Sequence, residues 1–322
     1  PIARGRMVRP TSTQRARKNL RNNYMPTVEV KNLFKSYNGQ IAVKNLSFNV
    51  DPGEILGLIG PNGAGKSSTI KIMLDFMKPD SGEVELFGRQ MSEAAKNRIG
   101  YLPEARGLYK ELKALDCILY LASLKGMDKA TAKERALQML ERTGMLDSEK
   151  KKIKHMSKGM GQMIQFIVTI IHDPELLIMD EPFSGLDPVN TELMKNMVAK
   201  YRDEGKAIIL STHQMNQVEE LCDRVLMIDH GEEVLYGDLR EIKSRFKKHS
   251  VQVAVDGEIG DINGVTERRT TKDGFELLLA EEASPQGVLD QVRGQGLEIQ
   301  RFEITTPSLH SIFLHVVGGD HE

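Results

Sequence analysis

The sequence has few cysteines, and their spacing suggests no pairing. Among 322 residues only Cys117 and Cys222 occur, without a CxxC motif or the spacing of metal ligands. A disulfide framework is therefore not expected, and the low cysteine content favours a reducing cytoplasm. We expect both thiols to be buried and free.

Long hydrophobic runs are also missing. The longest mostly apolar stretch, residues 164–171, is far shorter than the roughly 20 residues that a helix needs to cross a bilayer. We therefore expect no membrane-spanning segment, so a function at a membrane would require a separate membrane subunit.

A large excess of one charge is absent as well. The formal net charge is −1 and 40% of the residues are hydrophobic. This composition argues against a chain-wide nucleic-acid footprint, a disordered protein and an integral membrane protein. The length predicts a soluble globular protein with one large domain and a smaller attachment.

The N-terminal segment departs from this balance. Residues 1–24 contain seven Arg or Lys and no acidic residue, but they lack the apolar core of a secretory signal. A basic arm of this kind could bind anionic lipid or nucleic acid. We favour an upstream extension, expect it to be disordered and assign it no function.

A glycine-rich loop is the first motif along the chain that indicates a chemical function. Residues 60–67, GPNGAGKS, fit the P-loop pattern, which average composition yields by chance about one time in a hundred in a chain of this length. An apolar strand at 54–59 precedes the loop, and a helix expected at 67–77 follows it and receives phosphate at its N-terminus. Loop N–H groups can surround a β-phosphate, while Lys66 reaches the β and γ oxygens and the Ser67 hydroxyl binds Mg²⁺.

The second motif lies at the carboxyl end of an apolar strand, where α/β proteins bind ligands. Residues 176–179 are followed by Asp180, which we expect on the Mg²⁺ side, and Glu181, which can polarise an attacking water. His213 follows another apolar strand and can donate to a γ-phosphate. The other histidines, including His155, His172 and His230, have no comparable placement.

Strands and helices alternate along most of the chain, which indicates a mostly parallel sheet. Two strands come first, at 28–33 and 41–50, and residues 111–145 show helical spacing interrupted at Gly126. Three further strands and two helices follow, at 176–179, 207–210 and 225–228, and at 190–204 and 214–222. Residues 111–145 therefore form a helical insertion between the two chemical motifs.

The pattern of predicted secondary structure changes beyond about residue 245. Short strands are expected at 250–256, 264–269 and 274–280. Two helices follow, one opened by Ser284-Pro285 and stopped by Gly294, the other opened by Thr306-Pro307 and stopped by Gly318. This part reads as a small α+β domain without catalytic residues, suited to regulation or partner contact.

These motifs, spread from Tyr37 to His213, resemble those of the ATP-binding subunits of ABC transporters. The resemblance implies that Tyr37 stacks on adenine and that Asp187 contacts the opposite subunit of a head-to-tail dimer. It also implies that the loop at 157–160 closes on ATP held by the partner's P-loop. The tail, with LHSIFLHVVGG near its end, resembles the C-terminal extension of the sodium-extrusion and drug-export branch.

The residues expected to bind ATP in one subunit or the other are Tyr37, Gly60, Pro61, Asn62, Gly63, Ala64, Gly65, Lys66, Ser67, Ser68, Ser157, Lys158, Gly159, Met160 and Asp187. The expected catalytic residues are Glu181, His213, Lys66 and Glu104. The expected Mg²⁺ site comprises Ser67, Glu104 and Asp180.

Three positions depart from the family pattern. The signature, commonly LSGGQ, reads MSKGM, so Lys158 replaces a glycine and Met160 replaces the glutamine. Glu104 stands where the family usually has a glutamine that senses Mg²⁺ and water; a carboxylate can accept a hydrogen bond there but cannot donate one. Met163 stands where Arg or Lys is frequent, and the sequence alone offers no account of its effect.

The expected fold is an α/β P-loop NTPase core of the ABC type with an N-terminal antiparallel β subdomain and a helical subdomain. Residues 25–244 would form the ATP-binding domain, with the helical subdomain at about 105–165, and 245–322 a small α+β accessory domain. The predicted function is ATP hydrolysis that drives a separate polytopic membrane permease, as an exporter of sodium, drugs or another small solute. The subunit would use ATP and Mg²⁺, pair with itself or with a paralogous ATPase, bind no nucleic acid and lie peripherally at the cytoplasmic face of the membrane.

The alternative is a soluble ABC-type ATPase of translation or DNA repair. The chain has one cassette and no sustained heptads, whereas translation relatives usually have two cassettes and repair relatives a long coiled coil. Copurification with a membrane protein, as opposed to ribosomes or DNA, would separate the two functions. A nucleotide-binding regulator with little turnover is a third possibility, disfavoured by Glu181 and His213.

Overall fold

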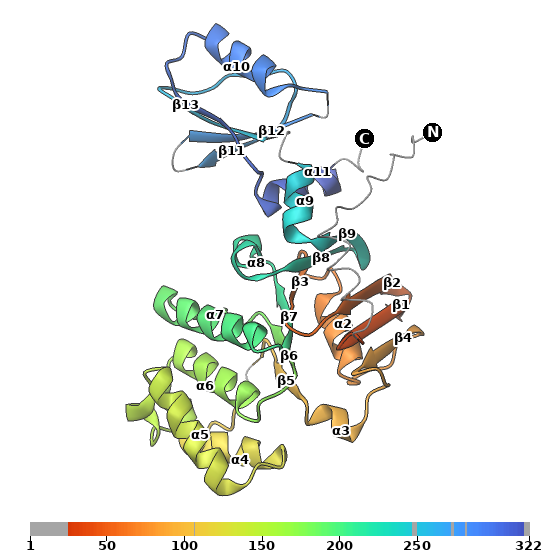
Figure 1. The fold of residues 1–322 in the computed structure, drawn as a ribbon, viewed down its shortest axis with the longest axis vertical. Coiled ribbons are helices and arrows are strands. Elements are labelled where there is room, and N and C mark those ends of the chain that lie inside the picture. The colour runs from red at the N-terminus through yellow and green to blue at the C-terminus, as the bar shows by residue number, and fades with distance from the viewer. Residues whose placement is uncertain (1–24, 106, 247–249, 272–273, 281, 319–322) are drawn as a thin grey trace.

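The structure is a computed structural model that describes residues 25–105, 107–246, 250–271, 274–280 and 282–318. The predicted basic extension at 1–24 lies outside these residues. Figure 1 shows the accessory domain at one end of the molecule and the helices α4 and α5 at the other. Within the described ranges, no helix is long and apolar enough to cross a membrane.

The central sheet has six strands in the order β5-β6-β7-β3-β8-β9. Its first five strands run parallel and only β9 is antiparallel, so the predicted mostly parallel sheet is confirmed. The strands, in chain order, are β3 (Ile55–Ile59), β5 (Ile99–Leu102), β6 (Leu176–Asp180), β7 (Ala207–Thr212), β8 (Arg224–Asp229) and β9 (Glu232–Asp238). The carboxyl ends of β6 and β7 therefore lie side by side and bring Asp180 next to Ser211.

A three-stranded antiparallel sheet packs on one side of this core, in the order β2-β1-β4. It contains β1 (Val28–Tyr37), β2 (Gln40–Val50) and β4 (Ser81–Leu86). Helix α2 (Lys66–Met73) shares a buried apolar cluster with both sheets. The helix ends four residues earlier than the predicted 77, because Leu74 caps it and Asp75 adopts a left-handed φ of 59°.

The helical insertion predicted at 111–145 consists of α4 (Ala114–Leu124) and α5 (Lys129–Arg142). Gly126 separates them with a φ of 78°, a conformation that glycine adopts without steric cost. Asp128 then begins α5 by accepting hydrogen bonds from Ala130 and Thr131 backbone N–H groups. Two 3₁₀ turns, Leu146–Ser148 and Ile153–His155, lead to the next helix.

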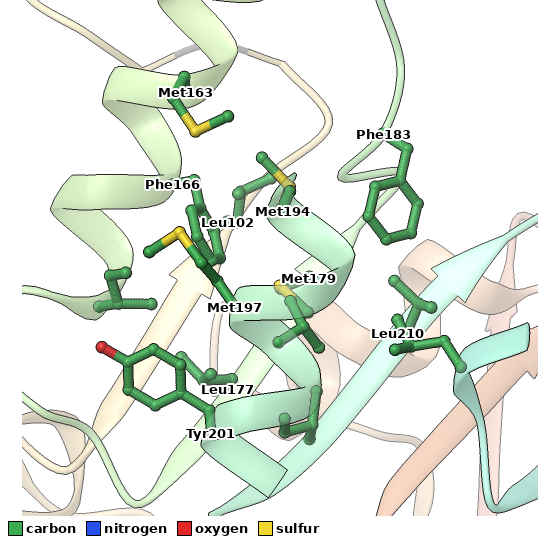
Figure 2. Close-up of a cluster of buried hydrophobic side chains, with 14 of the residues drawn as sticks. Leu102, Met163, Phe166, Leu177, Met179, Phe183, Met194, Met197, Tyr201 and Leu210 are labelled. Atoms are coloured by element: carbon green, nitrogen blue, oxygen red, sulfur yellow. The ribbon is translucent and has the colours of Figure 1, made fainter. Parts of the chain in front are cut away.

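Helices α6 (Lys158–Ile170) and α7 (Pro188–Asp203) cover one face of the central sheet. In Figure 2, Met163 and Phe166 of α6 share a buried cluster with Met194 and Met197 of α7 above the strands. Met163 is only 1% exposed. Its role is therefore to fill the core, which explains why an apolar residue is accommodated at this position.

The remaining helices of the ATP-binding part are short. They are α3 (Glu93–Lys96), α8 (Met215–Leu221) and α9 (Leu239–Arg245). Ser92 caps α3 and Asp238 caps α9, each by accepting from backbone N–H groups of the first turn.

The accessory part has a four-stranded antiparallel sheet in the order β11-β12-β10-β13, packed on helix α10 (Pro285–Gly294). Its strands are β10 (Ser250–Val255), β11 (Val265–Thr271), β12 (Gly274–Leu279) and β13 (Ile299–Ile304). Strand β13 was not predicted. The last helix, α11 (Leu309–Gly318), begins later than predicted because Ser308, and not Thr306, accepts the capping hydrogen bond from the Ser311 backbone N–H.

Candidate functional site

A cavity of about 430 Å³ lies where the glycine loop meets the ends of β6 and β7. Its walls are Ala42, Asn62, Gly63, Gly65, Lys66, Ser67, Ser68, Glu104, Asp180, Glu181, Ser184 and His213. A larger cavity of about 770 Å³ lies beside α8 and α9, but it contains none of the phosphate-binding motif. The smaller cavity is the candidate site because it alone of the two gathers the glycine loop, the carboxylates and the histidine.

The glycine loop owes its shape to close backbone contacts. Gly60 and Gly65 have φ values of 151° and 107°, and a Cβ atom at Gly65 would lie 2.3 Å from the Ala42 carbonyl oxygen. At Gly60 a Cβ atom would lie 2.0 Å from the Ile228 carbonyl oxygen. Larger residues are excluded at both positions, so the loop keeps its backbone N–H groups at the N-terminus of α2.

Lys66 points back into its own loop. Its ammonium donates to the carbonyl oxygens of Gly60 at 2.7 Å and Pro61 at 2.9 Å. Burial lowers the pKa of Lys66, while the charges of Glu181, Asp180 and Glu104 oppose this shift. The three carboxylates therefore favour the ammonium form, which can exchange its carbonyl partners for phosphate oxygens.

Asp180 accepts hydrogen bonds from two hydroxyl groups, one at the start of α2 and one near the end of β7. The Ser67 hydroxyl donates to its Oδ2 at 3.2 Å, and the Ser211 hydroxyl donates to its Oδ1. The side chain is buried. Ser67 and Asp180, two of the residues predicted for the cation site, are therefore in contact. Ser211 was missed, since only the register of β6 against β7 brings it there.

Glu181 lies at a strained backbone position and bonds to the end of β7. Its φ is 48°, in the left-handed region that non-glycine residues rarely adopt. Its Oε1 accepts from the His213 backbone N–H at 3.0 Å and lies 2.7 Å from the His213 Nδ1. Its Oε2 accepts from the Thr212 hydroxyl at 3.3 Å. The backbone and the β7 end thus fix this carboxylate at the cavity wall.

Glu104 enters the cavity from the loop after β5. The loop is anchored by Gln165, whose amide donates to the Pro103 carbonyl oxygen at 2.8 Å. Nearby, burial and the charges of Asp180 and Glu104 raise the pKa of Tyr101 to about 12. The phenol therefore stays protonated. Through Gln165, α6 holds the loop that carries Glu104 in place.

Several predicted residues do not line this cavity. Tyr37 is 39% exposed at the end of β1, and its hydroxyl contacts the Met77 sulfur at 2.6 Å. Gly60, Pro61 and Ala64 belong to the loop but do not form the cavity wall.

The signature residues 157–160 also lie outside the cavity. They were expected as a loop, but Lys158, Gly159 and Met160 form the first turn of α6. Ser157 caps this helix and accepts from the Met160 backbone N–H at 3.2 Å. The expectation of a loop was wrong because a serine followed by an apolar helix is itself an N-cap.

Two contacts join α6 to the turn that carries Asp187. A Cβ atom at Gly185 would lie 2.5 Å from the Lys158 Cδ, so the lysine stem passes directly over this glycine. The buried Gln162 donates to the Pro182 carbonyl oxygen at 2.8 Å. Asp187 caps α7 by accepting from Asn190, which lowers the pKa of Asp187. The signature helix and this turn therefore form one unit.

The arrangement can bind a polyphosphate and one hard cation. Among the described residues no group of three or more His, Cys, Asp or Glu side chains could hold a metal ion alone. The paired hydroxyl of Ser67 and carboxylate of Asp180 supply oxygen ligands of the kind that Mg²⁺ binds together with phosphate oxygens. Glu181, next to this pair, is placed to accept a proton from water.

Comparison with known proteins matches both parts of the chain. Residues 43–184 match the ABC transporter family, and residues 237–317 match the ATP-binding protein DrrA1-3-like C-terminal domain. The uncharacterized ABC transporter ATP-binding protein YhaQ of Bacillus subtilis is 40% identical over 296 residues, which cover 91% of this chain and 99% of YhaQ.

Two relatives carry names that refer to drug resistance. The linearmycin resistance ATP-binding protein LnrL of Bacillus subtilis is 30% identical and aligns over 90% of this chain and 98% of its own length. The daunorubicin/doxorubicin resistance ATP-binding protein DrrA of Streptomyces peucetius is also 30% identical, over 92% of this chain and 94% of DrrA.

Solved structures share the fold. The ATP-binding subunit of an ABC transporter superposes with a TM-score of 0.64 at 31% identity, covering 68% of this chain and 93% of that subunit. An ATP-binding cassette solved as a dimer bound to ADP and Pi superposes with a TM-score of 0.61 at 24% identity, covering 66% of this chain and 99% of that cassette.

Proposed function

The chain belongs to the ATP-binding proteins of ABC transporters, and from this premise we propose how its own residues hydrolyse ATP and what that hydrolysis drives. As a member of this family it is an ATPase that works with a membrane permease and dimerises. Nothing in the comparisons favours a role in translation or DNA repair. The assignments below concern individual residues, the metal, the partner and the cargo.

The residue assignment rests on three groups that line one cavity: the glycine loop with Lys66, the carboxylate of Glu181 and the imidazole of His213. Loop N–H groups and Lys66 would hold the β- and γ-phosphates at the N-terminus of α2. Glu181 would accept a proton from the attacking water, and His213 would hold the γ-phosphate after its ring leaves Glu181. These roles follow from where each group lies relative to the glycine loop.

Mg²⁺ would be held by Ser67 and Asp180 together with phosphate oxygens of the nucleotide. The hydroxyl and carboxylate already lie 3.2 Å apart, and Glu104 faces the same cavity. When bound, the ion would neutralise charge on the phosphates. Glu104 would bind the ion directly or accept a hydrogen bond from its water shell, but a carboxylate there cannot donate one.

The remaining predicted residues would act in a head-to-tail dimer. Ser157, Lys158, Gly159 and Met160 would face ATP bound to the partner, with Asp187 at the subunit boundary. Their position on the first turn of α6, outside this chain's own cavity, supports a role in trans. Tyr37 would stack on adenine, since its ring is partly exposed. The partner would be a second copy or a paralogous ATPase.

An exposed aromatic surface supports docking of a membrane permease on the helical part. The rings of Tyr109 and Tyr120 pack edge to face with centroids 5.1 Å apart, and both are more than two-fifths exposed. Leu124, at the end of α4, is 61% exposed. Exposed apolar clusters of this kind mark interaction sites. We place the subunit peripherally at the cytoplasmic face of the membrane through this contact.

The cargo would be exported. The names of LnrL and DrrA refer to linearmycin and daunorubicin/doxorubicin resistance, and this supports export of a drug or another small solute, with sodium as a further candidate. In this scheme residues 25–244 form the ATP-binding domain, with its helical subdomain at about 105–165, and 245–322 form the accessory domain.

Replacement of the proposed base tests the assignment. We expect Glu181→Gln to retain ATP binding but to lower the rate constant for hydrolysis by a factor of at least about 100, because the water loses its proton acceptor. The variant should also accumulate as an ATP-bound dimer. Single-turnover hydrolysis and size-exclusion chromatography with Mg-ATP measure both effects.

Glu192→Gln is the matched control, because Glu192 is an exposed glutamate on α7 outside the cavity. It should hydrolyse ATP like the original protein. Turnover by Glu181→Gln at the rate of this control would refute the assignment of the base.

A further inference from the structure

Helix α11 begins at a point where carboxylates from two different parts of the chain meet. Glu219 of α8 accepts from the Leu309 backbone N–H. Glu276 of β12 accepts from the Ser308 backbone N–H at 3.0 Å and from the Ser311 hydroxyl at 3.2 Å. The first turn of a helix leaves N–H groups that need acceptors, and its dipole favours negative charge there. We call this pair of glutamates and the start of α11 the carboxylate clasp.

The packing around the clasp belongs to the ATP-binding core. Leu309 and Ile312 are fully buried in the same cluster as Val218 and Leu221 of α8. Figure 1 shows α11 beside α9, between the accessory sheet and α8. Although α11 comes last in the chain, it is therefore held by the core at one side and by β12 at the other.

Glu219 makes a second contact that ties α9 to the same point. Its Oε2 lies 2.9 Å from the Lys243 ammonium, with both side chains 24% exposed. One carboxylate on α8 thus contacts both α9 and α11. Loss of this side chain would remove polar contacts from the outer end of α8 to both helices at once.

The other end of α8 leads into the catalytic cavity. The helix begins two residues after His213, and its buried Gln217 accepts from the Thr212 hydroxyl at 3.4 Å. Thr212 is also the residue whose hydroxyl lies 3.3 Å from the Glu181 carboxylate. A chain of contacts therefore runs from the proposed base through Thr212 and α8 to Glu219.

We propose that the accessory domain regulates ATP hydrolysis through the carboxylate clasp, by fixing the position of α8 and with it the groups around Glu181. The proposal rests on the ATPase function proposed above. With the clasp closed, α8 holds the backbone at the end of β7, which carries Thr212 and His213, in the position seen here. When the accessory sheet moves and Glu276 withdraws from α11, α8 shifts and hydrolysis slows.

Substitutions at the two glutamates test the coupling in the full chain. We expect Glu219→Ala and Glu276→Ala each to lower kcat for ATP hydrolysis about fivefold or more, with KM changed less than about twofold. Glu220→Ala is the matched control: Glu220 is the neighbouring glutamate on α8, but its carboxylate pairs with Lys195 of α7. It should leave kcat unchanged.

The double variant distinguishes coupling from general damage. If both glutamates act through one clasp, Glu219→Ala/Glu276→Ala should lose little more activity than either single variant. Multiplied losses, or kcat values like those of Glu220→Ala, would overturn the proposal. Glu219→Gln and Glu276→Gln keep the side-chain shape and serve where an alanine variant fails to fold.

Hydrogen exchange provides a readout that needs no turnover. Glu276→Ala lies in the accessory domain, yet we expect it to speed amide exchange in residues 212–221. Unchanged exchange there would overturn the coupling even in a preparation that does not hydrolyse ATP. Absence of hydrolysis by the unmodified chain would instead refute the proposed function.

Discussion

At the scale of single residues, Glu104 is the departure with the most direct chemical consequence. A carboxylate facing Asp180 and Glu181 adds negative charge to one cavity. We therefore expect closure of the dimer by ATP to depend more strongly on Mg²⁺ in this protein than in Glu104→Gln. Mg²⁺ titrations of ATP-dependent dimerisation measure this, and superimposable curves for the two proteins would contradict it.

Lys158 is the second departure. Its stem lies over Gly185, and among the described residues its ammonium has no acidic partner within ion-pair distance. We expect Lys158→Met to keep the packing and to weaken ATP-dependent dimerisation at low salt by about threefold or more, because the ammonium no longer attracts the partner's γ-phosphate.

The dependence on salt distinguishes an electrostatic role of Lys158 from that of a solvated side chain without a role in dimerisation. High ionic strength should erase the difference between the original protein and Lys158→Met, since it screens exposed charges. Lys158→Arg, which keeps the charge, is the matched control. If Lys158→Met and Lys158→Gly both dimerise normally at low salt, the lysine is only a solvated side chain.

The site residues that could be predicted lie in local sequence motifs, whereas those that were missed reach the site through contacts with distant parts of the chain. Lys66 and Asp180 stand in motifs whose neighbours alone indicate a loop or a strand end. Ser211 bonds to a residue 31 positions away, and Ala42 borders the cavity only because β2 passes close to Gly65. Such contacts depend on strand register and packing, which no local pattern specifies.

At the scale of secondary structure elements, long periodic or strongly apolar segments could be predicted and short or edge elements could not. The helices of the insertion and four strands of the central sheet, β3, β6, β7 and β8, were found. The two edge strands of that sheet, β5 and β9, were not predicted, and neither was helix α6. Strands β4 and β13 were missed, since both expose many polar residues on their free side. The start of α11 was misplaced because two candidate caps, Thr306 and Ser308, lie two residues apart.

The connection from α6 to β6 contains a pH-sensitive contact. Burial lowers the pKa of His172 to about 4, with the charge of Lys125 as a further cause. The His172 Nε2 lies 3.1 Å from the Ile99 carbonyl oxygen on β5. Because the folded state binds this proton more weakly than the unfolded state, its contribution to stability is present above about pH 6.5 and is lost as the pH falls toward 4.

This contact should be visible in unfolding experiments. We expect the free energy of unfolding to fall by up to about 3 kcal/mol between pH 7 and 4 through His172, and to fall less in His172→Gln. Urea denaturation at several pH values measures the difference, with the exposed His155→Gln as control. Parallel pH profiles for His172→Gln and the original chain would contradict this role.

At the scale of the whole molecule, the decisive question is whether each ATP site combines two chains. A mixture of Lys66→Ala and Ser157→Arg subunits tests it, because a mixed head-to-tail dimer contains one site with an intact glycine loop and an intact signature. We expect the mixture to recover about a quarter of the original ATPase rate, since half of the dimers are mixed and each has one of two sites.

The control mixture uses the same two changes in one chain. Lys66→Ala/Ser157→Arg subunits combined with unmodified subunits form mixed dimers in which both sites are damaged. Those mixed dimers should contribute no activity. If each chain built its site alone, the first mixture would stay inactive and the dimer proposed here would be wrong.

The hydrogen bonds between Glu181 and His213 bear on the resting subunit. Both nitrogens of His213 that face the carboxylate, the backbone N–H and Nδ1, lie within 3.0 Å of the same Oε1. If Glu181 is the base, the imidazole occupies one of the two contacts at that oxygen until the ring swings toward a γ-phosphate, while the backbone N–H keeps the carboxylate oriented. Rotation of one exposed ring would then control when hydrolysis begins, so that a subunit without its dimer partner hydrolyses little ATP.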